Sequence, residues 1–184
     1  QKDLETENPK QEELYEVGTV GTIKQIIKLP KHIMRVLVSG ETRGVLQKIE
    51  YEDPYLRAEV DVMDESDVLI RDDLNAQAME RGLKDMFVDF AAKSGKMSKE
   101  SVAQVLEIKG LKKLVDEIAA NTPLFYTDLQ EILNETDFWK RYEALAFKLV
   151  NEIQIMNLKE EIQMKVKERV DKHQREYILR EQLK

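Results

Sequence analysis

The 184-residue chain has no cysteine, two histidines, and few residues that interrupt regular structure, with 7 glycines and 4 prolines. The lack of cysteine excludes a disulfide framework, a thiolate metal site and a cysteine nucleophile. No apolar run approaches the ~20 residues that span a bilayer, so no membrane helix is predicted. The polar, acidic start has no signal-peptide pattern. Together these absences favour a cytoplasmic protein.

The charge balance is acidic, with a formal net charge of -7. Residues 1–70 hold 9 basic and 15 acidic residues, whereas residues 148–184 hold 9 basic and 7 acidic ones. An acidic chain repels phosphate backbones, so nucleic acid is disfavoured as a partner. Charged residues make up 35% of the chain, above the typical ~25%, and this excess favours exposed helices.

Residues 1–65 have a β-rich pattern. The runs VGTVGTIKQIIKL (17–29) and IMRVLVSG (33–40) flank a short break containing proline, which predicts a hairpin. Gly40 and Gly44 predict a turn before the next extended run. Residues 55–62 alternate, which predicts a half-buried strand. The inner face of that strand would carry Leu56, Ala58, Val60 and Val62.

Residues 66–135 are predicted to form a helical bundle after an acidic loop, MDESDVLIRDD (63–73). Gly95 and Gly110 end helices, Ser98 caps the start of one, and Thr127 with Gln130 resembles a capping box. Apolar side chains recur at three- and four-residue spacing. The stripes are Ala76, Met79, Leu83, Met86, Phe87 and Phe90; Val102, Val105 and Leu106; Leu111, Leu114, Val115 and Ile118; and Leu129, Ile132 and Leu133.

Residues 136–184 contain neither glycine nor proline and predict one long helix, roughly 70 Å in length at 1.5 Å per residue. Its second half has a narrow apolar stripe among charged residues. We therefore expect it to project from the bundle and to pair with another helix. The candidate pairing seam consists of Ile162, Val166, Val170, His173 and Tyr177.

No catalytic or nucleotide-binding motif is apparent. His32 and His173 lie in different predicted elements, so a Ser-His-Asp triad lacks an evident base. Gly95-Lys96 is followed by Met97, and Phe90 stands where a P-loop has its first glycine. The chain is therefore predicted to be non-enzymatic, with no catalytic, cofactor or metal site of its own.

The remaining possibility is binding. Leu29, Pro30, Ile33 and Met34 surround the predicted hairpin turn, and apolar groups at an exposed tip can mark a contact site. They are the candidate substrate contacts. In the alternative interpretation, the same residues begin and end strands that pack on a core.

Two stretches resemble the N-terminal region of the bacterial ATP-dependent Lon protease. One is ELYEVGTVGTIKQIIKLPKHIMRVLVSGETRGVL (13–46), similar to the β-hairpin block of that family. The other is KVKERVDKHQREYILREQLK (165–184), similar to the family's long linker helix, with QREYILREQLK the more specific part. Between them, LQEILNETDFWKRYEAL (129–145) is the best local match.

The resemblance implies an α+β fold: a small β-rich PUA-like subdomain (1–65, incomplete at its start), a helical subdomain (66–135) and a long linker or coiled-coil helix (136–184). It implies a non-catalytic region for substrate recognition and assembly. The parent would be a cytoplasmic, hexameric ATP-dependent endopeptidase with a Ser–Lys dyad, using ATP and Mg. Its partners would be unfolded or degron-bearing proteins, and the fragment would self-associate, for example as a dimer.

Two departures bear on these expectations. Lys31-His32 stands where the family usually has Asp-Gly, so the turn type is open. The family's opening strands are missing before Gln1, which would leave an open sheet edge able to pair with another chain.

Two other functions are also compatible with the pattern. One is a structural coiled-coil scaffold or adaptor without substrate binding. The other is nucleic-acid binding, because PUA domains bind RNA, although the acidic front argues against it.

Overall fold

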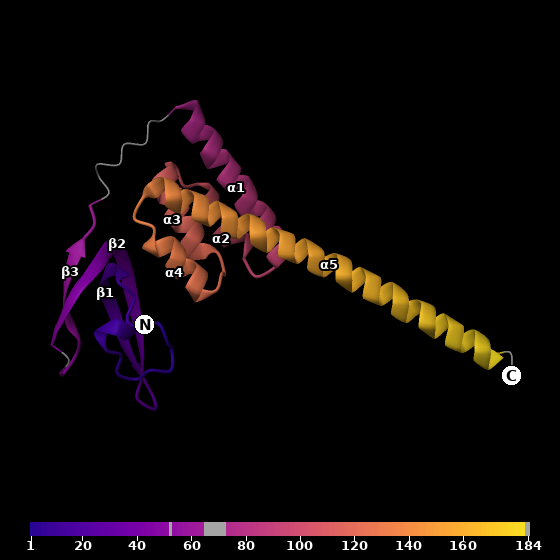
Figure 1. Cartoon of the computed structure of the whole chain (residues 1–184), viewed down its shortest axis with the longest axis horizontal. Coiled ribbons are helices and arrows are strands. Elements are labelled where there is room, and N and C mark those ends of the chain that lie inside the picture. Colours follow the sequence, from indigo (N-terminus) through magenta and orange to yellow (C-terminus); the bar gives the residue numbers. More distant parts are fainter. Residues whose placement is uncertain (52, 65–72, 183–184) are drawn as a thin grey trace. The chain divides into compact units, whose positions relative to one another are not determined.

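The computed structural model describes residues 1–51, 53–64 and 73–182. The described residues form two compact units (Figure 1). One contains those of residues 1–69 together with 129–138, and the other those of residues 70–128 together with 139–184. A three-stranded sheet comes first in the chain and helices follow, which confirms the α+β prediction. The three-domain division at residues 65 and 135 stays a prediction.

The first unit is built around an antiparallel sheet of order β1-β2-β3. Its strands are β1 (Val17–Leu29), β2 (Ile33–Tyr51) and β3 (Arg57–Val62), preceded by a short 3-10 helix, η1 (Gln11–Glu13). The predicted hairpin is confirmed with the expected strand bounds at 29 and 33. β1 is thus an edge strand paired on one side only by β2.

The turn predicted between Gly40 and Gly44 is wrong, because β2 runs through both residues. The glycines serve close packing instead of chain reversal. A Cβ on Gly21, which pairs with Gly40, would lie 2.6 Å from the Ser39 carbonyl oxygen. A Cβ on Gly44 would lie 2.5 Å from a methyl carbon of Val60. Neighbouring strands need these positions to lack side chains.

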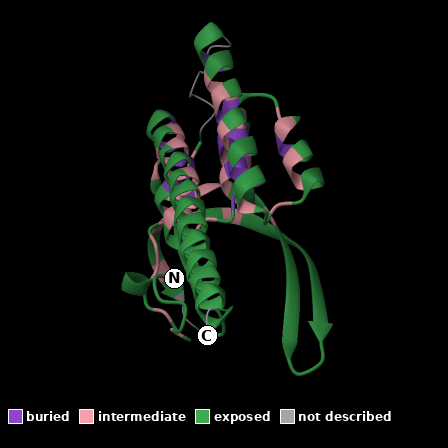
Figure 2. Cartoon of the chain, turned by 90° about the vertical axis from the view of Figure 1, so that its right-hand side faces the viewer, coloured by how far each residue is buried: buried purple, intermediate pink, exposed green. Residues whose placement is uncertain are grey.

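The alternation correctly predicts a strand near residues 55–62, but the prediction that one of its faces is buried is wrong. All residues of β3 are exposed, including Ala58, Val60 and Val62, and Leu56 precedes the strand. Figure 2 shows the same contrast: most buried residues lie in the helices, while β3 and the outer part of the β1–β2 hairpin are exposed. Period-two alternation predicted the strand correctly but not a core beneath it.

The helices are α1 (Leu74–Ser94), α2 (Lys99–Leu106), α3 (Leu111–Asn121), α4 (Tyr126–Asn134) and α5 (Phe138–Gln182). The predicted Ser98 cap is confirmed, since its hydroxyl accepts a hydrogen bond from the Ser101 amide. Gly95 ends α1 with a φ of 61°, and Gly110 precedes α3 with a φ of 93°. Both angles suit glycine, which lacks the Cβ that makes them costly. Most of the predicted loop at 63–73 lies outside the described residues.

The capping box predicted at Thr127 is wrong, because α4 begins one residue earlier, at Tyr126. The Gln130 side chain does not reach back to a cap. It donates hydrogen bonds to the Val17 carbonyl at 2.8 Å and to Asn134 Oδ1 at 2.7 Å. Gln130 therefore connects α4 to the start of β1.

The helical unit contains most of the buried apolar residues, and the predicted stripes supply many of them, while Ile132 and Phe138 are buried in the first unit. Met79 and Met86 are half-buried. The fully or nearly fully buried apolar residues of this unit are Ala76, Leu83, Phe87, Phe90, Ala91, Val105, Leu111, Leu114, Val115, Ile118, Leu145 and Leu149. A polar contact accompanies them. The Tyr142 hydroxyl donates to the Met79 carbonyl, and burial raises the pKa of Tyr142.

Arg141 is the largest fully buried side chain, with 1% of its surface exposed. One guanidinium nitrogen lies 3.4 Å from Asp116 Oδ1, so this ion pair links α5 to α3. A guanidinium is buried only when its charge is compensated. Its alkyl stem also fills space between the helices.

The long helix is confirmed as a single element of 45 residues. Its first part contributes Leu145 and Leu149 to the core, and from Asn157 to Gln182 every residue is exposed. Figure 1 shows this second half extending away from α1–α3 as an isolated rod. At 1.5 Å per residue it is about 39 Å long.

We predict that Arg141→Ala lowers the free energy of unfolding of the helical unit by about 3 kcal/mol, because it removes a buried stem and an ion-pair partner of Asp116. The measurement is urea unfolding followed by circular dichroism. Arg169→Ala on the exposed half of α5 is the control and should stay within about 0.5 kcal/mol of the parent chain. Equal effects of the two variants would contradict a structural role for the pair.

Candidate functional site

The outer part of the β1–β2 hairpin, Gly21–Val38, is exposed at every residue. We call this segment the hairpin tip. It holds nine large apolar side chains, each 36–63% exposed. They are Ile23, Ile26, Ile27, Leu29, Ile33, Met34, Val36, Leu37 and Val38. Such a dense apolar group on a surface is typical of an interaction site.

The cross-strand register divides the tip into two faces. Side chains of paired residues share a face, and faces alternate along each strand. Between Ile23 and Gln25 the register shifts by one residue, so Lys24 has no partner and forms a β-bulge. This bulge moves Ile23 to the side of Ile26.

Each face is largely apolar. We name the faces after a central residue of β2. The Leu37 face carries Gln25, Ile27, Leu29, Ile33, Arg35 and Leu37, and the Val36 face carries Ile23, Ile26, Lys28, Met34, Val36 and Val38. A half-buried hairpin has one apolar face and one polar face. The hairpin tip instead offers apolar contacts on both sides.

The structure separates the candidate contacts that the sequence grouped together. Leu29 and Ile33 are cross-strand partners on the Leu37 face. Met34 pairs with Lys28 on the Val36 face, and Pro30 lies in the turn. The alternative interpretation, in which these residues pack on a core, is not borne out, because all four are exposed.

Sequence reasoning missed the other apolar residues of the tip, from Ile23 to Ile27 on β1 and from Val36 to Val38 on β2. The available signal was the absence of alternation in the runs Ile26-Ile27 and Val36-Leu37-Val38. Consecutive apolar residues in a strand place apolar groups on both faces. Such runs usually indicate a strand buried on both sides. In this hairpin, both faces that carry these runs are exposed to solvent.

The turn of the hairpin uses a backbone conformation that its residues disfavour. Lys31 has a φ of 64° and His32 a φ of 58°. Positive φ at two successive residues is the requirement of a type I′ turn, which glycine and asparagine meet most easily. The turn left open by the sequence therefore has left-handed backbone at both residues, although neither is a glycine.

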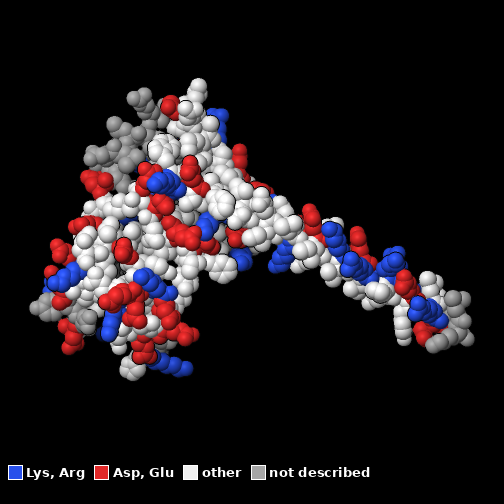
Figure 3. All heavy atoms as spheres, in the orientation of Figure 1, with Lys and Arg blue, Asp and Glu red and all other residues white. Residues whose placement is uncertain are grey.

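The candidate pairing seam lies on the exposed half of α5. Ile162, Val166 and Val170 are 49–60% exposed, and Tyr177 is 67% exposed. The spacing of four, four, three and four residues from Ile162 through His173 to Tyr177 keeps the side chains on one face. Figure 3 shows charged side chains of both signs along α5, interleaved with uncharged ones. This is the pattern of a helix that pairs with another helix along a narrow apolar stripe.

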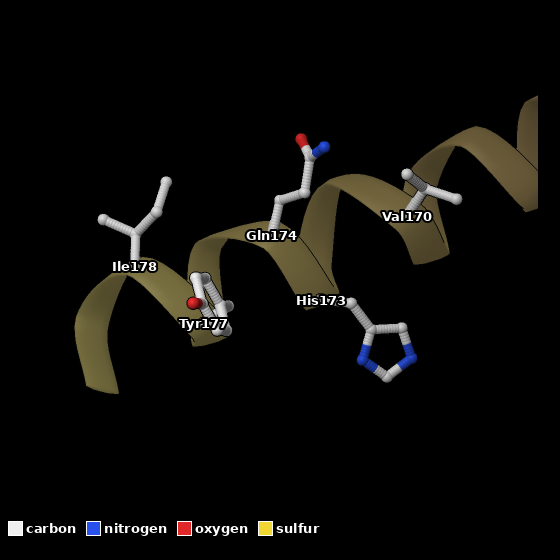
Figure 4. Close-up of a pocket in the computed structure, with 5 residues that line it drawn as sticks. All are labelled: Val170, His173, Gln174, Tyr177 and Ile178. Atoms are coloured by element: carbon white, nitrogen blue, oxygen red, sulfur yellow. The ribbon is translucent and has the colours of Figure 1, made fainter. Parts of the chain in front are cut away.

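A shallow hollow lies at the far end of this seam, lined by Val170, His173, Gln174, Tyr177 and Ile178. Figure 4 shows that these side chains leave the helix in different directions and do not converge. All of them come from α5, so the hollow is the gap between neighbouring side chains of one helix. A ligand pocket needs converging groups from several elements. The hollow is better understood as part of the candidate pairing seam.

Within the described ranges, no three His, Asp or Glu side chains are grouped so that they could hold a metal ion. The two histidines remain apart, with His32 in the hairpin turn and His173 on α5. No helix among the described residues is long and apolar enough to cross a membrane.

Comparison with known proteins gives matches over the whole length of the chain. Residues 1–151 match the family model described as the ATP-dependent protease La (LON) substrate-binding domain. The chain is similar to the Lon protease of Lachnoclostridium phytofermentans, with 40% identity over 184 residues. It is also similar to the Lon protease of Clostridioides difficile, with 38% identity over 186 residues. All of this chain is covered in both cases, but only 23% and 24% of the relatives.

A solved structure resembles the fold. The N-terminal domain of the Mycobacterium avium complex Lon protease aligns with a TM-score of 0.58, covering 79% of this chain and 74% of that one. The sequence identity is 18%, so this likeness concerns the fold alone.

We predict that His32→Gly stabilises the hairpin tip by up to about 1 kcal/mol, because glycine adopts positive φ without a Cβ penalty. Amide hydrogen exchange in residues 22–38 should then slow by up to about fivefold. His32→Val is the matched control and should speed exchange, since a β-branched residue disfavours this φ further. The prediction fails if both substitutions change exchange in the same direction.

Proposed function

The chain belongs to the family of ATP-dependent protease La (LON) substrate-binding domains, and on this premise we propose that it is a non-catalytic region for substrate recognition and assembly. The substrates would be misfolded and short-lived regulatory proteins that expose unfolded or degron-bearing segments. The observation that carries the proposal is the hairpin tip, with nine exposed apolar side chains on two faces.

The parent protein is proposed by relation to the family. The chain spans about a quarter of the length of the relatives named above. The whole protein would be a cytoplasmic, hexameric serine endopeptidase with a Ser–Lys dyad, using ATP and Mg in parts that this chain does not contain. The chain itself would supply no nucleotide site and no catalytic group.

Apolar contacts favour unfolded over folded substrates for a physical reason. A folded protein buries most of its large apolar side chains, whereas an unfolded one exposes them to water. Covering exposed apolar surface yields roughly 25 cal/mol per Å². The hairpin tip therefore discriminates by the state of folding and needs no particular sequence. Met34 suits this task, because its flexible, polarizable side chain adapts to varied partners.

The assembly role would fall to α5. A free apolar stripe on a helix without a core gains stability when it pairs with a second helix. The seam from Ile162 to Tyr177 fits a second copy of this chain.

The same exposed helix favours a second candidate function, a structural coiled-coil scaffold or adaptor without substrate binding. In that case α5 would pair normally, but the hairpin tip would not bind unfolded polypeptide. Binding by the tip therefore distinguishes the two functions.

We expect the purified chain to bind a labelled, permanently unfolded protein and not the folded form of the same protein. Met34→Glu should weaken this binding several-fold, because it places a charge on the Val36 face. The measurement is fluorescence anisotropy.

Met164→Glu is the matched control. Met34 is 63% exposed and Met164 60% exposed, and Met164 lies on α5 away from the seam. No binding by the unaltered chain would favour the scaffold. Equal weakening by both substitutions would place the contact outside the hairpin tip.

For the seam, Ile162→Asp with Val170→Asp should lower self-association, because two charges then interrupt the apolar stripe. Analytical ultracentrifugation measures the outcome. Met164→Asp with Leu179→Asp is the control, since these residues are 60% and 58% exposed and lie on other sides of α5. An unchanged sedimentation profile in the seam variant would contradict pairing through these residues.

A further inference from the structure

α2 is a short helix that is attached to the helical unit by a small apolar contact. Its eight residues, Lys99–Leu106, include one buried side chain, Val105, with 3% of its surface exposed. α1 buries five side chains and α3 buries four. A helix of this length is not stable in water without packing against other elements. Local opening of α2 therefore costs much less apolar contact than opening of α1 or α3.

Two glycines bound the segment that carries α2. Gly95 has a φ of 61° and Gly110 a φ of 93°. Apart from its chain neighbours, a Cβ on either residue would have no atom within 4 Å, so both glycines lie in open space. Glycine changes between left- and right-handed backbone at little cost, and hinges use such residues. Residues 96–109 can therefore rotate between two unobstructed pivots.

A lysine of α1 holds the far end of this segment. Lys84 Nζ donates a hydrogen bond to the Ile108 carbonyl at 2.8 Å, and it also pairs with Glu80 at 2.8 Å. Within the described ranges, this is the hydrogen bond that joins residues 99–109 to another helix. The chain leaves α1 at its end and returns to Lys84 after α2, so α2 runs back along the last turns of α1.

The place of this hydrogen bond indicates which side chains α2 covers. Lys84, Phe87 and Ala91 are separated by three and four residues, so they share one face of α1. Phe87 is fully buried and Ala91 is nearly so. Because Lys84 reaches the end of α2 from this face, we infer that α2 lies over Phe87 and Ala91. Opening of α2 would expose an apolar face on α1.

The pattern of α2 shows what kind of ligand fits that face. Its apolar side chains, Val102, Val105 and Leu106, stand at helical spacing, with Val105 buried and the other two half-buried. The helix makes about two turns at 3.6 residues per turn. A replacement for α2 is therefore an amphipathic helical segment of similar length, with apolar side chains three and four residues apart.

We propose that α2 is a hinged flap that covers an apolar binding face on α1, with Gly95 and Gly110 as pivots and Lys84 as the latch. The ligand is an amphipathic helical segment that displaces α2 and binds beside Phe87 and Ala91. This face lies within the helical unit and is independent of the hairpin tip and of the α5 seam. Because α2 is tethered, it competes at a high effective concentration, so the flap limits which segments bind.

Native-state amide hydrogen exchange tests the flap in the unaltered chain. Relative to their rates in an unfolded chain, amides of residues 102–108 should exchange at least about tenfold faster than those of residues 84–91 and 114–118. Equal protection in all three ranges would mean that α2 opens only with the whole core. That result would overturn the proposal.

The latch is tested by Lys84→Met, which removes the hydrogen bond to Ile108 and keeps an apolar stem. Exchange in residues 102–108 should speed up by about five- to tenfold, because a charge-assisted hydrogen bond no longer favours the closed state. Lys93→Met is the matched control, since Lys93 also pairs with an acidic residue four positions earlier, Asp89, at 3.8 Å. It should change exchange less than about twofold, and equal effects of the two variants would rule out Lys84 as a latch.

The binding face is tested with a labelled peptide that has the sequence of residues 97–109. Val105→Asp in the chain should prevent docking of α2 and leave the face vacant. By fluorescence anisotropy, the peptide should bind this variant at least about tenfold more tightly than the unaltered chain, because the tethered competitor is absent. A peptide carrying Val105→Asp is the control and should not bind.

Circular dichroism and exchange in residues 84–91 show whether the Val105→Asp chain keeps α1 folded. If it does not, Lys84→Met takes its place, and peptide binding should then improve by the same factor as the exchange of residues 102–108 increases. If the peptide binds neither variant more tightly than the unaltered chain, or if the charged peptide binds equally well, α2 covers no binding face and the proposal is wrong.

Discussion

The backbone ladder between β1 and β2 is the constraint on which the hairpin tip depends. No side chain between Gly21 and Val38 is buried, so the tip has no core to hold its strands together. What remains is the hydrogen-bonded pairing and the contacts between cross-strand neighbours. The ladder also decides what the tip presents, because the one-residue shift at Lys24 determines the face on which Ile23 lies. The register of the two strands therefore decides which side chains each face of the hairpin tip presents.

The helical unit is stabilised in a different way. Its apolar stripes meet in a core that excludes water, and Arg141 is accommodated there beside Asp116. Apolar side chains therefore have different roles in the helical unit and in the hairpin tip. The helical unit contains most of the buried apolar residues and gains stability from them, while the hairpin tip keeps its apolar residues exposed and available for contact. The difference explains how one chain contains both an ordinary core and a large apolar surface.

The sequence predicted the positions of the helices and strands better than the burial of their side chains. Helical stripes such as Leu111 to Ile118 were correct because a 3.6-residue period implies a buried face in a bundle. The alternation of β3 implied burial just as strongly, but burial depends on a covering layer, which no local pattern reveals. The glycines at 40 and 44 predict a turn, but they lie within β2, where Gly44 allows the close approach of Val60, and only the pairing of the strands reveals this. The candidate contacts at Leu29 and Met34 were found in the hairpin, whereas their separation onto two faces required the register of the ladder.

The length of α5 has a mechanical consequence. Its first turns are clamped in the core by Leu145 and Leu149, and the exposed half extends about 39 Å beyond them. A rod clamped at one end amplifies small rotations. A tilt of about 5° at the clamp moves the far end sideways by about 3 Å for a rod of this length. Small repacking among the helices would therefore appear at Tyr177 as a sideways displacement large enough to bring the helix into contact with a neighbouring helix or to separate the two.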